Sequence, residues 1–243
     1  DRPGQQALYA QVLVRLGACE VLLGNFARGE QLLQDGLQAG HLPHERAVAL
    51  VYLGLAAAER GEMPLSRARL QESLTISRAN NDNAGIARAL LYLLQAESDY
   101  AQAHRICTES LAFARKTGRP DLIAHVLIYL GFFKGCLGDY APANTCLKEG
   151  MELCEQLGLR NEKAWALDSM GVVAWCVGDV AAAEGYLDEA LVIYTELGRS
   201  TAIGMCLADL TLVLVDKGEV QRAVAAGQKA VAITRAVDGQ MML

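Results

Sequence analysis

The chain has 243 residues, of which 52% are apolar and 6% aromatic, and it carries a net charge of −6. Such an acidic chain is a poor candidate for nucleic-acid binding, because phosphate contacts depend on clustered Lys and Arg. No apolar run approaches the roughly 18 residues that a membrane-spanning helix requires, so we expect no membrane association. The opening residues, Asp1-Arg2-Pro3-Gly4, are typical of a loop rather than of a signal peptide.

The seven cysteines are odd in number and show no zinc-ligand spacing. Most of them lie beside apolar residues in the sequence, where a reduced thiol acts as a small hydrophobic group. We therefore interpret them as buried structural thiols, which implies a reducing cytoplasm.

A short turn phrase recurs every 37 to 40 residues along the whole chain. An internal repeat with a period in this range indicates stacked helical hairpins. We therefore predict an all-α solenoid of six helix-turn-helix repeats. The six copies of the phrase are Gly24-Asn25-Phe26, Gly61-Glu62-Met63, Ser98-Asp99-Tyr100, Gly138-Asp139-Tyr140, Gly178-Asp179-Val180 and Gly218-Glu219-Val220.

The phrase predicts twelve helices in one domain, residues 1–243, with repeats at about 5–44, 45–82, 83–120, 121–160, 161–200 and 201–239. The helix pairs are 5–23 with 27–39, 45–60 with 65–80, 83–96 with 100–116, 121–137 with 141–157, 161–177 with 181–197, and 201–217 with 220–237. The third repeat is three residues short, and we place the gap before Ser98, so that its first helix ends about one turn early. Expected left-handed caps are Gly40, Asn81, Gly118, Gly158, Gly198 and the Asp238-Gly239 pair.

Small residues keep fixed distances from each turn. A glycine preceded by a large residue stands seven residues before four of the six turns, and small residues stand five and twelve residues after every turn, as at Ala183 and Ala190. Glycine inside a helix costs about 1 kcal/mol relative to alanine, so it needs a packing reason. We interpret these positions as crossings where two helix backbones approach closely. The glycine pairs are Leu16-Gly17, Leu53-Gly54, Leu130-Gly131 and Met170-Gly171.

These offsets resemble the tetratricopeptide repeat, from residue 5 to residue 236. The chain departs from that family in its period near 40 residues and in lacking the proline that commonly closes each repeat. The longer variant is similar to the sensor arrays of large bacterial regulators, such as the maltose-operon activator and related signal-transduction NTPases. With neither end carrying a polar cap, we expect a fragment of a longer array. The closing positions hold His41, Arg78, Arg115, Glu155, Thr195 and Arg235.

No residues form a recognisable catalytic or metal-binding set. The sequence has no Gly-x4-Gly-Lys-Ser/Thr loop and no Gly-x-Ser-x-Gly motif. His41 and His44 are three residues apart, in a stretch without nearby cysteine or paired carboxylates. We therefore expect no enzymatic activity, no cofactor and no bound metal.

In tetratricopeptide arrays the first helix of each repeat lines a concave groove, so the resemblance implies a partner-binding surface there. The alternative is that the aromatic rings fill gaps between neighbouring first helices; for Trp165 the two interpretations are equal, and for Tyr52 and Tyr129 we favour the groove. Residues 1–120 carry a net charge of +1 and residues 121–243 carry −7. We expect an apolar or aromatic anchor on the partner, with positive charge directed toward Asp168, Asp209 and Asp216. The expected groove residues are Arg15, Tyr52, Arg88, Tyr92, His125, Tyr129, Phe132, Trp165, Asp168, Trp175, Asp209 and Asp216.

The resemblance implies a ligand-sensing, protein-binding array of a cytoplasmic bacterial signalling or transcriptional regulator. Its expected partners are a protein, a peptide or a small effector, together with effector domains of the same longer chain, and neither nucleic acid nor membrane. A constitutive scaffold without a sensing role is the alternative. A change of shape or of conformational population on ligand binding would distinguish the two.

Overall fold

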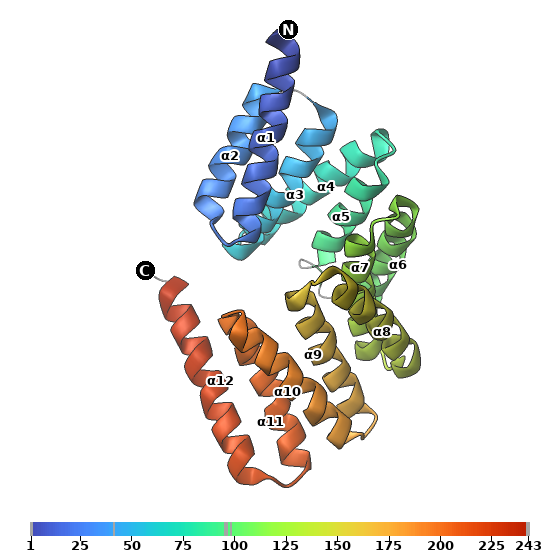
Figure 1. Cartoon of the computed structure of the whole chain (residues 1–243), viewed down its shortest axis with the longest axis vertical. Helices are drawn as coiled ribbons and strands as arrows, with labels where there is room; N and C mark the ends of the chain where they lie inside the picture. The colour runs from blue at the N-terminus through green and yellow to red at the C-terminus, as the bar shows by residue number, and fades with distance from the viewer. Residues whose placement is uncertain (1, 41, 95–96, 98, 242–243) are drawn as a thin grey trace. The chain divides into compact units, whose positions relative to one another are not determined.

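The computed structural model describes the backbone of residues 2–40, 42–94, 97 and 99–241, and in this part of the chain it contains α-helices and no strand (Figure 1). The all-α class and the predicted helix pairs are therefore confirmed. The helices are α1 (Arg2–Leu22), α2 (Phe26–Ala39), α3 (Pro43–Glu59), α4 (Met63–Ala79), α5 (Asn83–Leu93), α6 (Tyr100–Thr117), α7 (Pro120–Cys136), α8 (Tyr140–Leu157), α9 (Arg160–Cys176), α10 (Val180–Glu196), α11 (Ser200–Asp216) and α12 (Val220–Met241).

The chain divides into two compact units, Asp1–Leu122 and Ile123–Leu243. In each unit, consecutive helices pack as antiparallel hairpins, and the first helix of one hairpin packs on the hairpin before it. In the first unit α3 packs on both α1 and α2, and in the second α11 packs on both α9 and α10. None of the helices described here combines the length and the apolar content that a bilayer crossing requires.

The recurring turns that begin with glycine are left-handed helix caps, and Ser98 of the third turn lies outside the described residues. Gly178 has φ +84°, and the amide of Asp179 donates a hydrogen bond of 2.9 Å to the carbonyl of Ala174, which closes the end of α9. Glycine adopts this φ without the steric cost that a side chain brings. The carboxylate of Asp179 then accepts a hydrogen bond from the Ala182 amide at 3.1 Å, which caps the start of α10. Glycine and aspartate thus have separate roles in ending one helix and starting the next.

The caps at Asn81, Gly118, Gly158 and Gly198 are left-handed as predicted. Gly40 is different, because its backbone is extended at φ −154° and ψ 150°. The chain passes almost directly into α3, and a Cβ atom at Gly40 would lie 2.8 Å from that of Ala10. Close packing, and not a left-handed turn, therefore explains this glycine.

The structure differs from the prediction at both ends of the chain and at the end of α5. The first residues are helical, since α1 begins at Arg2, where Pro3 is tolerated because amides of the first turn have no helical partner. Asp238-Gly239 does not end a helix, because α12 continues to Met241. In the third repeat α5 ends at Leu93, earlier than the prediction of 83–96, whose last two residues lie outside the described part.

The thiols are divided between core and surface. Cys107, Cys154 and Cys206 are buried, and burial raises the pKa of Cys107 and of Cys154 to about 12. The interpretation of most cysteines as buried is wrong for three of them, because they occupy the exposed sides of first helices near their ends. The exposed cysteines are Cys19, Cys136 and Cys176.

Candidate partner-binding surface

We define the first-helix face as the side chains that stand thirteen, nine and six residues before each turn. In the second unit, α7, α9 and α11 contribute three such positions each. Most of these side chains are half-buried or exposed, and Ser169 is buried with 4% exposure. The positions are His125, Tyr129, Phe132, Trp165, Ser169, Val172, Met205, Asp209 and Leu212.

Four rings of α7 and α9 form an aromatic cluster, which consists of Tyr129, Phe132, Phe133 and Trp165. The Tyr129 and Trp165 rings meet edge to face, with centroids 4.2 Å apart. Phe132 lies 5.2 Å from Phe133 and 6.5 Å from Trp165. Such pairs contribute about 0.5–1.5 kcal/mol beyond the area they bury. Three of the rings keep part of their surface exposed, whereas Phe133 is 6% exposed and belongs to the core.

Trp165 fills space between helices, one of the two interpretations left open, and its role in partner binding stays a prediction. It packs against two core clusters of the second unit, and its ring also forms one side of the aromatic cluster. His125 stands one turn before Tyr129, and its Nε2 lies 3.4 Å from Oε1 of Glu162 in α9. Of the predicted residues of α7 and α9, Tyr129, Phe132 and Trp165 therefore lie together.

In the first unit the corresponding residues are more deeply packed. Tyr52 is 9% exposed and packs in the core of this unit, with its ring 6.4 Å from that of Tyr92. Tyr52 therefore fills the gap between α3 and α5, the interpretation that the sequence disfavoured. Arg15 is exposed and lies 3.9 Å from Glu45, while Arg88 is half-buried. Tyr52 is thus less accessible than the half-buried rings of Tyr129 and Trp165.

Trp175 and Asp216 join the ends of α9 and α11. The indole Nε1 donates a hydrogen bond of 2.6 Å to Oδ2 of Asp216. Asp216 is exposed and Trp175 is half-buried. The Asp216 carboxylate therefore already accepts a hydrogen bond within the array.

The sequence predicted that Asp168 lies in the groove, but the structure does not place it on the first-helix face. It stands ten residues before its turn, is 9% exposed, and has one carboxylate oxygen, Oδ1, that is buried without a hydrogen-bond partner. Burial, and then the nearby charge of Asp209, raise the pKa of Asp168 to about 7. Burial also raises the pKa of Asp209, which is half-buried on α11. The physical reason is helical phase, since one residue is about 100° around a helix.

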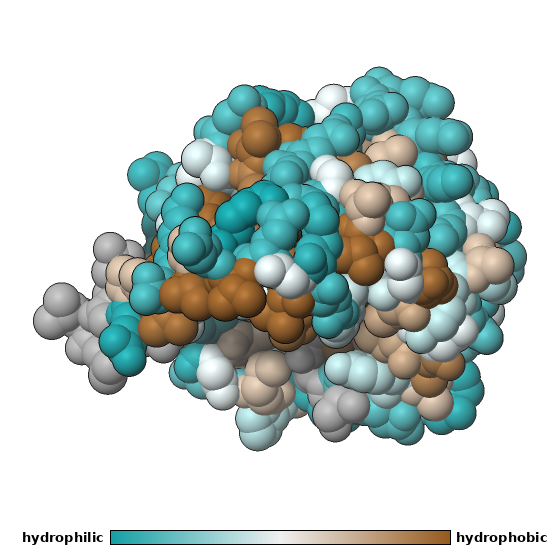
Figure 2. Space-filling view, turned by 90° about the horizontal axis from the view of Figure 1, so that it is seen from below, coloured by the Kyte–Doolittle hydropathy of each residue, from teal (hydrophilic) through white to brown (hydrophobic). Residues whose placement is uncertain are grey.

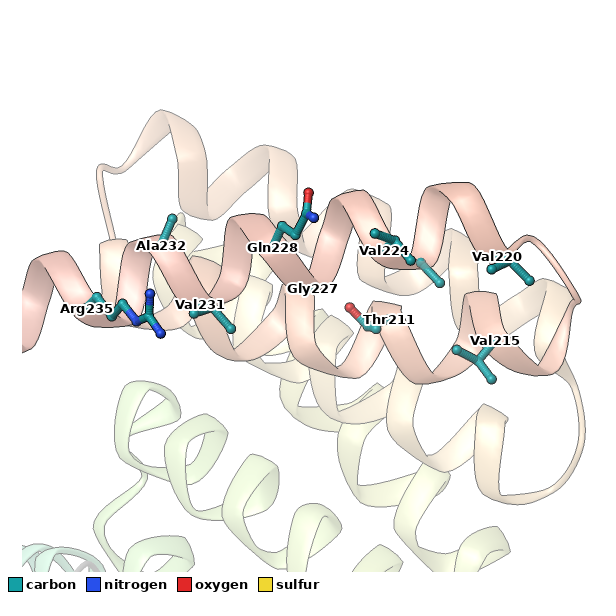
Figure 3. Close-up of a pocket in the computed structure, with 10 residues that line it drawn as sticks. Thr211, Val215, Val220, Val224, Gly227, Gln228, Val231, Ala232 and Arg235 are labelled. Atoms are coloured by element: carbon teal, nitrogen blue, oxygen red, sulfur yellow. The ribbon is translucent and has the colours of Figure 1, made fainter.

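A second apolar surface lies on α11 and α12. It lines an open cavity of about 540 Å³ (Figure 3). Figure 2 shows apolar side chains in a brown band on the left of the view, where α12 lies in Figure 1. Val220, Val224 and Val231 are 66%, 53% and 50% exposed. The cavity is lined by Thr211, Val215, Val220, Ala223, Val224, Gly227, Gln228, Val231, Ala232 and Arg235.

This surface repeats one that α11 covers in the preceding hairpin. Forty residues earlier, Val215, Val220 and Val231 correspond to Trp175, Val180 and Leu191. Those three residues pack against the core cluster that contains Leu210 and Val213 of α11. The α11–α12 surface is therefore apolar in the way that suits packing against the apolar face of an amphipathic helix.

Neither a protein-family model nor a curated protein sequence matches this chain. Solved structures are similar at low identity. The Rap protein complexed with competence and sporulation factor is 14% identical, with a TM-score of 0.70 over 96% of this chain and 76% of that one. NprR, solved with its cognate peptide NprX, is 13% identical, with a TM-score of 0.70 over 94% and 65%.

A signal transduction ATPase with a tetratricopeptide repeat sensor, from Pyrococcus horikoshii, is also similar. It is 14% identical to this chain, with a TM-score of 0.68. The match spans 94% of this chain and 36% of the ATPase. Together with the recurring turn and the small residues at the crossings, these similarities show that the chain has the fold of a tetratricopeptide repeat array.

Proposed function

We propose that this chain is a non-catalytic binding module that holds a segment of a protein or peptide against the first-helix face of its second unit. The aromatic cluster carries the proposal, because partly exposed rings on rigid helices are the usual anchors of protein interfaces. The exposed parts of Tyr129, Phe132 and Trp165 lie on neighbouring helices, so a single extended or helical segment could contact all three.

The acidic character of the second unit supports a partner with positive charge. Residues 121–243 carry a net charge of −7, and Asp209 stands on the same face as the aromatic rings. Complementary charge increases the association rate and selects among partners more than it raises affinity. Two similar structures are consistent with this role. NprR was solved with its cognate peptide, and the Pyrococcus horikoshii ATPase has a tetratricopeptide repeat sensor.

The finer proposal is that the array is the sensor of a cytoplasmic bacterial signalling or transcriptional regulator, with effector domains in the same longer chain. A small effector in place of a peptide would fit the same role. A constitutive scaffold is the alternative, and it predicts binding without any change in the array. Small-angle scattering of the chain with and without a bound peptide distinguishes them, because sensing requires a change of shape or population.

The binding proposal is tested by selecting hexapeptides from a random phage-displayed library against this chain. We expect enriched peptides with an aromatic or large apolar residue, whose binding Tyr129→Ala and Phe132→Ala weaken. Val192→Ala is the matched control, since Val192 is a 57% exposed apolar residue on a second helix, α10. Selection of no peptide, or of peptides that respond to Val192→Ala and not to the aromatic variants, would refute the proposal.

A further inference from the structure

One side of α1 repeats the side by which a later first helix packs on the hairpin before it. In α11, Cys206 and Leu210 stand twelve and eight residues before their turn glycine, and they are 0% and 5% exposed. Both belong to a core cluster that includes residues of α9 and α10. The corresponding residues of α1 are Val12 and Leu16, which are 51% and 45% exposed. This side of α1 is therefore an apolar packing side that no described residue covers.

The α11–α12 surface is the counterpart of that side. We define a junction as the contact between one hairpin and the first helix that follows it, such as the contact of α9 and α10 with α11. The α11–α12 surface corresponds to the hairpin's half of a junction, and the exposed side of α1 corresponds to the helix's half. Positions counted from the turns show which residues of the two halves would meet.

The first pair of corresponding positions is polar in the existing junction and apolar at the two exposed faces. Between α9 and α11, Nε1 of Trp175 donates a hydrogen bond of 2.6 Å to Asp216. Trp175 stands three residues before its turn and Asp216 stands two residues before its own. The residues at these positions of α11 and α1 are Val215 and Leu22, which are 57% and 55% exposed. Both members of the pair have therefore changed from polar to apolar.

A second pair has changed in the same way. Glu184 of α10 forms an ion pair with Lys217, which directly precedes the turn after α11. The corresponding residues are Val224 of α12 and Leu23 after α1, which are 53% and 77% exposed. Replacing one member alone would leave the other charge buried without its partner. Val224 also lines the open cavity on α11 and α12, so an apolar residue opposite it would cover the cavity.

A third pair comes from the junction of α7 and α8 with α9. There Nε2 of His125 lies 3.4 Å from Oε1 of Glu162. The residues at these positions of α11 and α1 are Met205 and Leu8, which are 64% and 61% exposed. In all three pairs both members are apolar at the exposed faces, and none sets an apolar residue against a charge. The two faces thus match each other residue by residue.

We propose that α1 of one copy of this chain packs on the α11–α12 surface of a second copy, in the place that the next first helix of the array would occupy. Leu22 then meets Val215, Leu23 meets Val224 and Leu8 meets Met205. An unrelated amphipathic helix would need only an apolar face, whereas the pairwise match points to α1 itself. Because the two faces differ, the contact is heterologous, and copies add until a ring closes or a filament grows.

Two blocking variants test this proposal in the whole chain. Leu23→Glu blocks the α1 side and Val224→Glu blocks the α11–α12 surface. Each residue is exposed, so both variants should keep the parent's circular dichroism. The measurement is the average mass by light scattering over a concentration series. The parent should grow in mass, and each variant alone should need a concentration at least about tenfold higher, because an unpaired carboxylate in an apolar contact is costly.

Mixing the two variants shows whether unlike faces meet. The Val224→Glu chain keeps its α1 side and the Leu23→Glu chain keeps its α11–α12 surface. An equimolar mixture should therefore form a complex of two chains that grows no further. Val192→Glu is the control and should associate like the parent, since Val192 is 57% exposed on α10, away from both faces. A monomeric parent, a monomeric mixture, or one blocking variant that associates like the parent would overturn the proposal.

A charge pair tests which residues meet. Leu23→Lys combined with Val224→Glu copies the ion pair of Lys217 and Glu184. The double variant should associate better than either single variant, and added salt should weaken it, because an exposed ion pair is screened. Losses that simply add in the double variant would show that the two positions do not meet, and would refute the proposed junction.

Discussion

Gly171 of α9 and Leu187 of α10 form a contact that leaves no space for a larger residue. A Cβ atom at Gly171 would lie 2.7 Å from Cγ of Leu187 and 3.3 Å from the carbonyl oxygen of Ala183. Gly131 and Leu147 repeat this contact at 2.6 Å in the preceding hairpin. Both leucines are fully buried, at 0% exposure. Each glycine thus sets the distance between the two helices of its hairpin.

Replacing either glycine by leucine should destabilise the chain. Gly131→Leu and Gly171→Leu overpack a crossing that includes backbone atoms, so we expect a loss of about 1–3 kcal/mol or more in the free energy of unfolding. Urea denaturation measures it. Gly185→Ala is the control, because a Cβ atom at Gly185 in α10 would meet no other atom within 4 Å. The free energy of unfolding of the Gly185→Ala variant should rise by up to about 1 kcal/mol. Leucine variants as stable as the parent would contradict the close packing of Gly131 and Gly171.

Stability should fall as the pH rises through the neutral range. The pKa of Asp168 is about 7 in the folded chain and near its ordinary 3.8 when unfolded. Between these values the folded state binds a proton that the unfolded state does not, so the free energy of unfolding decreases with rising pH and levels off above pH 7. The shift corresponds to at most about 4 kcal/mol.

The variants Asp168→Asn and Asp168→Ile test this dependence. Both should flatten the profile between pH 5 and pH 8, and the isoleucine, which copies Ile128 at the corresponding place in α7, should also be more stable than the parent at pH 8. Asp216→Asn should leave the profile unchanged, since Asp216 is exposed. A parent chain with constant stability over this range would show that Asp168 is ionised throughout.

Peptide binding should depend on the rings of α7 and α9. Phe132→Ala and Tyr129→Ala should each weaken the selected peptides by about 2 kcal/mol, or about 30-fold, which is typical of an aromatic anchor. Asp216→Asn should mainly flatten the salt dependence, because exposed charges act on the association rate. Calorimetry gives the affinities, and circular dichroism checks that helical content is kept. Binding that survives both aromatic substitutions would place the site elsewhere.

The apolar surface of α11 and α12 should make the chain associate at high concentration. Val224 is 53% exposed, and the residue forty positions earlier is Glu184. Val224→Glu should therefore be compatible with the hairpin and reduce association, as measured by light scattering over a concentration series. Val192→Ala on α10 is the control. A parent chain that is strictly monomeric at high concentration would contradict this prediction.

The two classes of thiol should differ in reactivity. Cys19, Cys136 and Cys176 are exposed and should react with an aromatic disulfide reagent in the folded state. Cys107 and Cys154 should react only after unfolding, because burial raises their pKa values to about 12 and excludes the reagent. Counting released thiolate before and after denaturant provides the measurement. Rapid reaction of all seven cysteines in the folded chain would contradict the burial of the second class.

Much of the fold could be predicted from the sequence because its determinants are local. Gly178 and Asp179 define a helix end and a helix start within two residues, and the spacing from Gly171 to that turn fixes where the hairpin closes. Gly40 and Gly239 were misjudged, since composition alone does not tell whether a glycine ends a helix, relieves crowding or lies within a helix.

The site was harder to predict than the fold. A constant offset from the turn placed Tyr129, Phe132 and Trp165 on one side of their helices, and their rings lie together in the structure. Asp168 was assigned to the surface although it is buried. Val14, Val51 and Ile128 stand at the same distance from their turns and are buried. A comparison with them would have indicated that Asp168 occupies a core position.

The residues whose contacts close the hairpins are near one another along the chain as well as in space. Gly17 meets Leu33, Gly54 meets Leu70, and Gly171 meets Leu187, and in each case the partners are separated by sixteen residues. Contacts this local lower the entropy cost of loop closure and favour rapid folding. Each hairpin can therefore form before its neighbours, and the chain can open one hairpin at a time, as in other arrays stabilised by nearest-neighbour interfaces. Hydrogen exchange should then show a gradient of opening free energies along the chain instead of one global value.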